Sequence, residues 1–167
     1  GAVALTAPLR GAFAGPDPVP ALAVVRPEID NLQQALTHAL ERNTAPAAAC
    51  IYRALAGLWA IESHIFGVTA RSSDVAYVLS HWNPGSGSPA EIDDVRAALG
   101  LAGCTAWVTR PATALRSVVA LRRLPAAAPR DFDAGFAWLL AEGLPRWIAD
   151  GIAVPEDLDT IPHPHVR

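Results

Sequence analysis

Residues 88–108 read SPAEIDDVRAALGLAGCTAWV, and this stretch decides the fold class. It begins with a capping box, in which Ser88 and Glu91 can each bond the backbone amide of the other. Pro89 follows at the first helical position, where its missing N–H costs nothing. Apolar residues then recur at helical spacing as Ile92, Val95, Leu99, Ala102 and Ala106. We therefore predict an amphipathic helix over 89–108.

The segments on either side carry the same kind of pattern. Apolar spacing, helix-starting prolines and glycine stops predict further helices over 27–42, 46–66, 71–82, 111–124 and 131–143. Residues 83–87, Asn-Pro-Gly-Ser-Gly, form the clearest loop. Because no segment alternates apolar and polar residues with β-branched enrichment, we expect little or no sheet.

The order of these helices predicts an architecture. A long helix followed by a shorter one occurs twice, and the short connections imply antiparallel neighbours. We predict an all-α domain of stacked antiparallel helix hairpins, similar to tetratricopeptide repeats or an α-solenoid, over 27–151. Residues 1–26, interrupted by Pro16, Pro18 and Pro20, are expected to be an extended lead-in. Residues 152–167 are expected to be an irregular tail.

Composition limits the function classes. A chain of 167 residues can bury a core without disulfides or metals, so Cys50 and Cys104 are expected to be buried free thiols. The net charge is −3 and the arginines are scattered, which argues against direct nucleic-acid binding. No apolar run approaches ~18 residues, so no membrane partner is expected. Without a signal-peptide pattern, a cytoplasmic location follows.

The chain contains no Met and no Lys, and its 13 basic residues are all Arg. The arginine and alanine bias is typical of a GC-rich bacterial genome. Either a start Met has been removed, or the chain is a piece of a longer protein. The abrupt opening at Gly1–Leu5 favours the second interpretation.

Residues 26–42, RPEIDNLQQALTHALER, resemble a recurring segment of large actinobacterial transcriptional regulators of the LuxR and SARP types. In those regulators such a helix follows a signalling NTPase core and opens a tetratricopeptide-like region. The matching residues are Glu28, Asp30, Asn31, Leu32, Ala35 and Leu36, with Leu55, Leu58 and Trp59 in the next helix. Residues 94–107 and 112–124 resemble a later hairpin. The phosphate loop and the helix-turn-helix of such regulators are absent from this chain, so the resemblance implies a signal-sensing or transmitting part.

Catalytic motifs are absent from the sequence. No Gly-x-Ser-x-Gly elbow surrounds any serine, and a Walker-type phosphate loop is excluded because the chain has no Lys. His38 and Glu41 have a spacing that could hold a metal, but they lie on a predicted solvated face. His163-Pro-His165 lies at the terminus, where disorder is the simpler interpretation. We therefore expect no enzymatic activity, no cofactor and no metal.

Tryptophans and one glutamate form the candidate site. Trp59, Trp82 and Trp107 lie on successive predicted helices and could converge on a binding groove with Glu62; core packing is the alternative. We expect a non-catalytic protein-interaction or signal-sensing module whose partner is another protein or another domain of the same chain, with a homodimer as a further option. The competing hypothesis is a small-molecule-binding helical bundle, or a helical enzyme, with Glu62 in a pocket.

Overall fold

The computed structural model describes residues 1–10, 12–14, 17–62, 64–107 and 109–125. Within these residues the regular structure is entirely helical, and no strand is present. The α-helices are α1 Ala2–Thr6, α2 Val19–Val25, α3 Ile29–Glu41, α4 Ala45–Ile61, α5 Ile65–Ser80, α6 Pro89–Ala106 and α7 Pro111–Arg123. Short 3-10 turns precede α2, α3 and α6. None of the helices in this part of the chain is both long and apolar enough to cross a bilayer.

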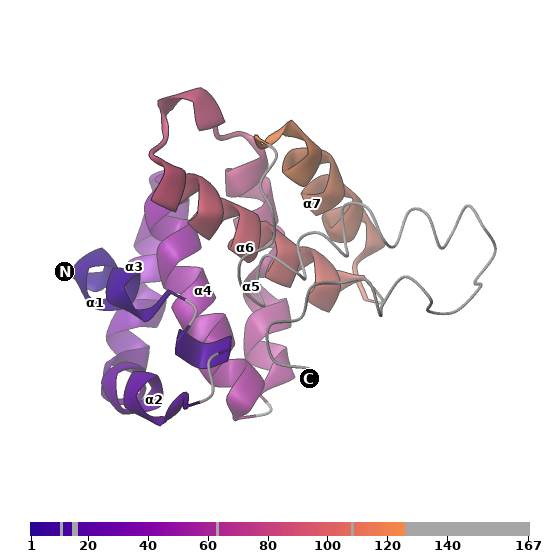
Figure 1. The fold of residues 1–167 in the computed structure, drawn as a ribbon. Helices are drawn as coiled ribbons and strands as arrows, with labels where there is room; N and C mark the ends of the chain where they lie inside the picture. The colour runs from indigo at the N-terminus through magenta and orange to yellow at the C-terminus, as the bar shows by residue number, and fades with distance from the viewer. Residues whose placement is uncertain (11, 15–16, 63, 108, 126–167) are drawn as a thin grey trace, which may run out of the picture.

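Helix α4 is the centre of the molecule. It contacts α1, α2, α3, α5 and α6 (Figure 1), and most of its residues are buried. Its sequence is rich in alanine, so its neighbours approach closely on several sides. Tyr52 is fully buried there and donates a hydrogen bond to the Val68 carbonyl oxygen of α5 (3.2 Å). Burial of the Tyr52 ring also raises the pKa of its hydroxyl.

The later helices follow one another in pairwise contact. Helix α5 packs against α6, and α6 packs against α7. Contacts also join helices that are two apart in sequence, α4 with α6 and α5 with α7. The apolar sides of these amphipathic segments thus meet in one core, whose fully buried members include Leu55, Val75 and Leu99.

The capping-box prediction is confirmed. Ser88 Oγ accepts from the Glu91 amide (3.3 Å), and Glu91 Oε2 accepts from the Ser88 amide (2.8 Å). Helix α6 therefore begins at Pro89, as the pattern predicts, and ends at Ala106. The predicted helix over 111–124 is confirmed as α7, with Pro111 in its first turn.

The expected extended lead-in over 1–26 is wrong, because this segment contains α1 and α2. Prolines do not prevent this, since Pro20 lies in the first turn of α2, where a missing N–H leaves no helical bond unmade. The apolar residues of the segment, among them Leu5, Leu9 and Phe13, pack against the main core. Burial thus stabilises helices that are too short to form alone.

The boundary between the second and third predicted helices is also wrong. Helix α4 ends at Ile61 rather than Phe66, and α5 begins at Ile65 rather than Arg71. The sequence reading took Gly67 as a helix stop, but it lies in the first turn of α5 against the Trp59 ring. A Cβ at Gly67 would lie 2.9 Å from Trp59 Cδ2, so the glycine serves close packing. The predicted helix over 131–143 and the predicted tail over 152–167 lie outside the described residues.

Candidate functional site

Trp59 and Glu62 occupy different environments at the end of α4. Trp59 is buried in the core. Glu62 follows the helix and accepts two hydrogen bonds from Arg26, from Nη2 at 2.7 Å and Nε at 2.9 Å. This ion pair lies at the surface and ties the turn before α3 to the end of α4.

Trp82 and Trp107 are both partly buried. Trp82 follows α5, whose 16 residues span roughly 24 Å from the end near Trp59. Trp107 follows α6, and the nearby Arg110 donates to the Thr69 carbonyl oxygen in the early part of α5 (3.1 Å). The ends of α4 and α6 that carry Trp59 and Trp107 therefore lie toward the start of α5. Trp82 lies at its opposite end.

A different hollow lies between α3 and α5. Its volume is about 370 Å³. It is lined by side chains from the last turns of α3, the following turn and the middle of α5: Thr37, Leu40, Glu41, Asn43, Arg71, Asp74, Tyr77 and Val78. We call this hollow the α3–α5 groove. It contains none of the four residues that the sequence suggested for a site.

Local backbone geometry sets the shape of the groove. Arg71, Asp74, Tyr77 and Val78 follow one another at helical spacing and so share a face of α5. On the other side, α3 ends at Glu41, and Asn43 turns the chain with a φ of 53°. Asparagine tolerates this left-handed conformation better than most residues. The turn directs the chain into α4 and leaves the end of α3 beside α5.

The groove has an apolar floor and a charged margin. Val78 is buried and Leu40 is partly buried. Arg71 Nη2 donates to Thr37 Oγ1 across the groove (3.1 Å). Glu41 and Asp74 are exposed, and neither carboxylate makes a hydrogen bond or ion pair with another described residue. Two acceptors therefore face solvent beside an apolar surface.

Tyr77 extends the groove toward α7. Tyr77 is 54% exposed. The guanidinium carbon of Arg116 lies 5.2 Å from the centre of the Tyr77 ring, and the His81 ring lies 4.6 Å away. These contacts hold the tyrosine ring at the surface, where it is available to a partner.

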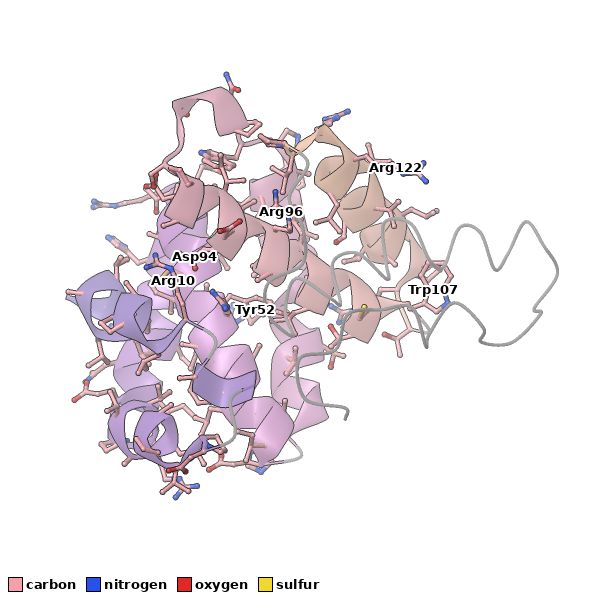
Figure 2. The ribbon with its side chains drawn as sticks, viewed as in Figure 1. Arg10, Tyr52, Asp94, Arg96, Trp107 and Arg122 are labelled. Atoms are coloured by element: carbon pink, nitrogen blue, oxygen red, sulfur yellow. The ribbon has the colours of Figure 1, made fainter. Side chains whose placement is uncertain are left out.

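A buried ionic cluster joins two helices, α4 and α6, to the N-terminal segment. Asp94 of α6 is 1% exposed. Arg10 binds it through two nitrogens, with Nε 2.8 Å from Oδ1 and Nη2 2.6 Å from Oδ2. Arg53 of α4 donates to Oδ1 from the other side (3.2 Å). Figure 2 shows Arg10 and Asp94 pointing toward each other. The hydrogen bond to Asp94 raises the pKa of Arg10.

Both cysteines lie in settings that keep a thiol protonated. Cys50 Sγ is 3.3 Å from Thr6 Oγ1 of α1, and burial raises its pKa. Burial raises the pKa of Cys104 to about 11. Since the thiolate is the nucleophile, neither group is activated for covalent chemistry at neutral pH. Within the described ranges, no three His, Cys, Asp or Glu side chains are grouped so as to hold a metal ion.

The sequence reading missed both the groove and the ionic cluster. The groove was not predicted because the helix was expected to begin at Arg71. Arg71 was therefore placed at a helix start and not on one face with Asp74 and Tyr77. Asp94 carried a signal, since it lies four residues before the buried Ala98 on the same side of α6. A carboxylate on a buried face requires a cation, but the sequence does not say which of 13 arginines supplies it.

Comparisons of the chain with family models, with curated proteins and with solved structures find no match.

Proposed function

We propose that the chain is a non-catalytic, helical protein-interaction module and that the α3–α5 groove binds a basic segment of a partner protein or of another domain. The observation that carries the proposal is the pair of carboxylates, Glu41 and Asp74, which make no ion pair with a described residue and lie beside an apolar floor, while Arg71 of the same groove is engaged by Thr37. An arginine or lysine side chain matches both features, since its stem is apolar and its end is cationic.

Binding of a cationic side chain at this margin of the groove has a low desolvation cost. Because both carboxylates are already in water, a partner cation gains charge-assisted hydrogen bonds without a large desolvation cost. Tyr77 adds an exposed aromatic ring, and tyrosine is a residue type that is enriched where proteins bind one another. A groove of about 370 Å³ holds a few side chains, which fits an extended peptide better than a globular surface.

The wider proposal is that these helices belong to a stack of hairpins similar to tetratricopeptide repeats. Contacts of α4 with α6 and of α5 with α7 support it, because stacked hairpins join helices two apart in sequence. Together with the resemblance of residues 26–42, this suggests a sensing part of a bacterial transcriptional regulator. A cytoplasmic location belongs to the same proposal. A neighbouring gene sequence encoding an NTPase or DNA-binding module would support it, and its absence would count against it.

The groove is tested with fluorescently labelled peptides that combine arginine with leucine, read by fluorescence anisotropy. The double variant Glu41→Gln/Asp74→Asn is expected to weaken binding by about tenfold, which equals ~1.4 kcal/mol. Asp30→Asn is the matched control, because Asp30 is an exposed acid at the other end of α3. It should leave the affinity within about twofold.

Two results would contradict the groove. One is equal binding of peptides in which glutamate replaces arginine. The other is binding that the double variant leaves unchanged. The competing hypothesis of Glu62 in a pocket gains nothing from the contacts described, since that carboxylate is paired with Arg26 at the surface.

A further inference from the structure

The first ten residues lie on the outside of the helical bundle, where α1 contacts α3 and α4 (Figure 1). We call residues 1–10 the N-terminal arm. The arm consists of the five-residue helix α1, a 3-10 turn over Ala7–Leu9, and Arg10. Within the arm only Thr6 is buried, whereas most residues of α4 are buried. The arm therefore rests on a small buried surface, and a helix of this length does not form without such contacts.

Two polar contacts join the arm to the rest of the molecule. Thr6 Oγ1 lies 3.3 Å from Cys50 Sγ of α4. Arg10 binds Asp94 of α6 through Nε and Nη2, and its Nη1 donates to the Ala7 carbonyl oxygen (3.2 Å). One guanidinium group thus orders the backbone of the arm and also holds the arm against α6.

The arm can leave without producing a buried charge that has no partner. The Arg10 side chain is already 36% exposed, and it becomes fully hydrated when the arm leaves. Asp94 keeps Arg53, which belongs to α4 and lies 3.2 Å from Oδ1, while water reaches the side that Arg10 occupied. Breaking a buried ion pair is costly chiefly because one charge stays buried alone, and that condition is not met here. Segments with few buried contacts also open at a lower free energy than the core.

We propose that the N-terminal arm is a releasable strap, which opens as a unit while α3–α7 stay folded and which the Arg10–Asp94 ion pair holds closed. Opening uncovers the Cys50 thiol and the Asp94 carboxylate, both of which are buried when the arm is in place. The strap does not depend on the proposed function of the α3–α5 groove, since no residue of that groove takes part in the two polar contacts.

The Cys50 thiol reports the open state in the full chain, with Cys104→Ala removing the other cysteine. Burial raises the pKa of Cys50 while the arm is closed, so a maleimide reacts with this thiol when the arm opens. The reference is Val75→Cys in a chain without the two native cysteines, because Val75 is fully buried on α5 and is reached only on global unfolding. We expect Cys50 to react about tenfold faster or more, with a rate that rises less steeply with urea. Circular dichroism supplies the global unfolding free energy of each variant.

Substitution of Arg10 tests what holds the strap closed. Arg10→Gln should raise the Cys50 labelling rate by about tenfold or more, because the charge-assisted hydrogen bonds to Asp94 are lost. Arg10→Lys keeps the charge but not the two-pronged geometry, so it should raise the rate less. Arg26→Gln is the matched control, since Arg26 binds Glu62 through the same two nitrogens, Nε and Nη2, outside the arm. It should change the labelling rate by about twofold or less.

Three results would overturn the proposal. If Cys50 reacts at the same rate and with the same urea dependence as the thiol at position 75, the arm leaves only when the whole molecule unfolds. If Cys50 reacts as fast as a thiol in an unfolded peptide, the arm does not close over it. Unchanged labelling in Arg10→Gln would mean that the ion pair does not hold the arm. Hydrogen exchange read by mass spectrometry supplies an independent check, because the amides of residues 2–10 should exchange with the free energy of opening that Cys50 labelling gives, and protection equal to that of α4 would contradict the strap.

Discussion

Two sets of acidic residues in this molecule differ in burial and in whether a cation neutralises their charge. Asp94 is 1% exposed and is held between Arg10 and Arg53. Glu41 and Asp74 are exposed at the α3–α5 groove and make no ion pair with a described residue. The first carboxylate is fully engaged by the fold, whereas the other two remain available to a partner.

The difference follows from solvation. A carboxylate removed from water is tolerated only when cations and hydrogen-bond donors replace its hydration. An exposed carboxylate keeps its hydration and needs no partner for stability. The buried charge of Asp94 therefore joins α4, α6 and the N-terminal segment, whereas the exposed charges of Glu41 and Asp74 play no such part in the fold.

The largest expected effect is at the buried carboxylate. Asp94→Asn keeps the shape of the side chain but removes the negative charge that Arg10 and Arg53, which is 7% exposed, both bind. We expect the free energy of unfolding to fall by about 3 to 5 kcal/mol, the usual cost of breaking a buried ion pair from one side. Urea denaturation monitored by circular dichroism measures this loss.

The neighbouring acid supplies the control for that variant. Asp93 is exposed and pairs with Arg96 one turn later on the surface of α6. Asp93→Asn should therefore change the free energy of unfolding by about 0.5 kcal/mol or less. Similar losses of unfolding free energy at positions 93 and 94 would show that burial is not the reason why Asp94 stabilises the fold.

A smaller effect is expected where the N-terminal segment covers α4. A Cβ at Gly57 would lie 2.5 Å from Phe13 Cγ, so Gly57→Ala forces the phenylalanine ring to move. We expect a loss of about 1 to 3 kcal/mol, although alanine in a helix interior normally stabilises relative to glycine. Thermal or urea unfolding measures it.

Removing the ring tests this explanation. In the Phe13→Ala background the steric conflict is gone, so Gly57→Ala should be neutral or stabilising there. An equal loss in both backgrounds would mean that Phe13 is not the group that position 57 meets.

Much of the fold could be predicted from the sequence because residues within one or two turns mark where several helices begin. The capping box at Ser88 and the apolar period behind it fixed the start of α6, and Pro111 fixed the start of α7. Those signals act within one or two turns. The helical lead-in could not be read in this way, since α1 and α2 are too short to form without their contacts to α4.

The candidate site was less predictable because it depends on contacts between distant segments. Arg10 and Asp94 are 84 residues apart in the chain, and nothing local to either position predicts the pairing. Tryptophans are large and frequent at binding surfaces, which made Trp59 a candidate, yet its side chain is buried in the core. Glu41 and Asp74 look like ordinary surface acids until α3 and α5 bring them to one groove.

The smallest effect concerns Glu91, a partly exposed acid that already accepts hydrogen bonds from the N-cap residue of its helix. Glu91 accepts from the amide and the hydroxyl of Ser88, and these hydrogen bonds lower its pKa. A carboxylate with a lowered pKa in the folded state contributes stability above its unfolded pKa and loses it as the pH falls through the folded value. Ser88→Ala should therefore raise the pKa of Glu91 toward its ordinary value, which NMR titration of the side-chain carboxyl measures.

Ser88→Ala also separates the two hydrogen bonds of the Ser88 hydroxyl, one with the Glu91 amide and one with the Glu91 carboxylate. Loss of the Ser88 hydroxyl should cost about 1 kcal/mol at neutral pH, since the Glu91 amide loses its acceptor. The stability difference from the parent should narrow as the pH falls below the folded pKa of Glu91, because protonation weakens the hydroxyl-to-carboxylate bond in the parent alone. Ser86→Ala, in the preceding loop, is the control and should show no such pH dependence. A difference that stays constant across the acid range would mean that the Ser88 hydroxyl acts only on the Glu91 amide, and that the Glu91 carboxylate depends on the Ser88 amide alone.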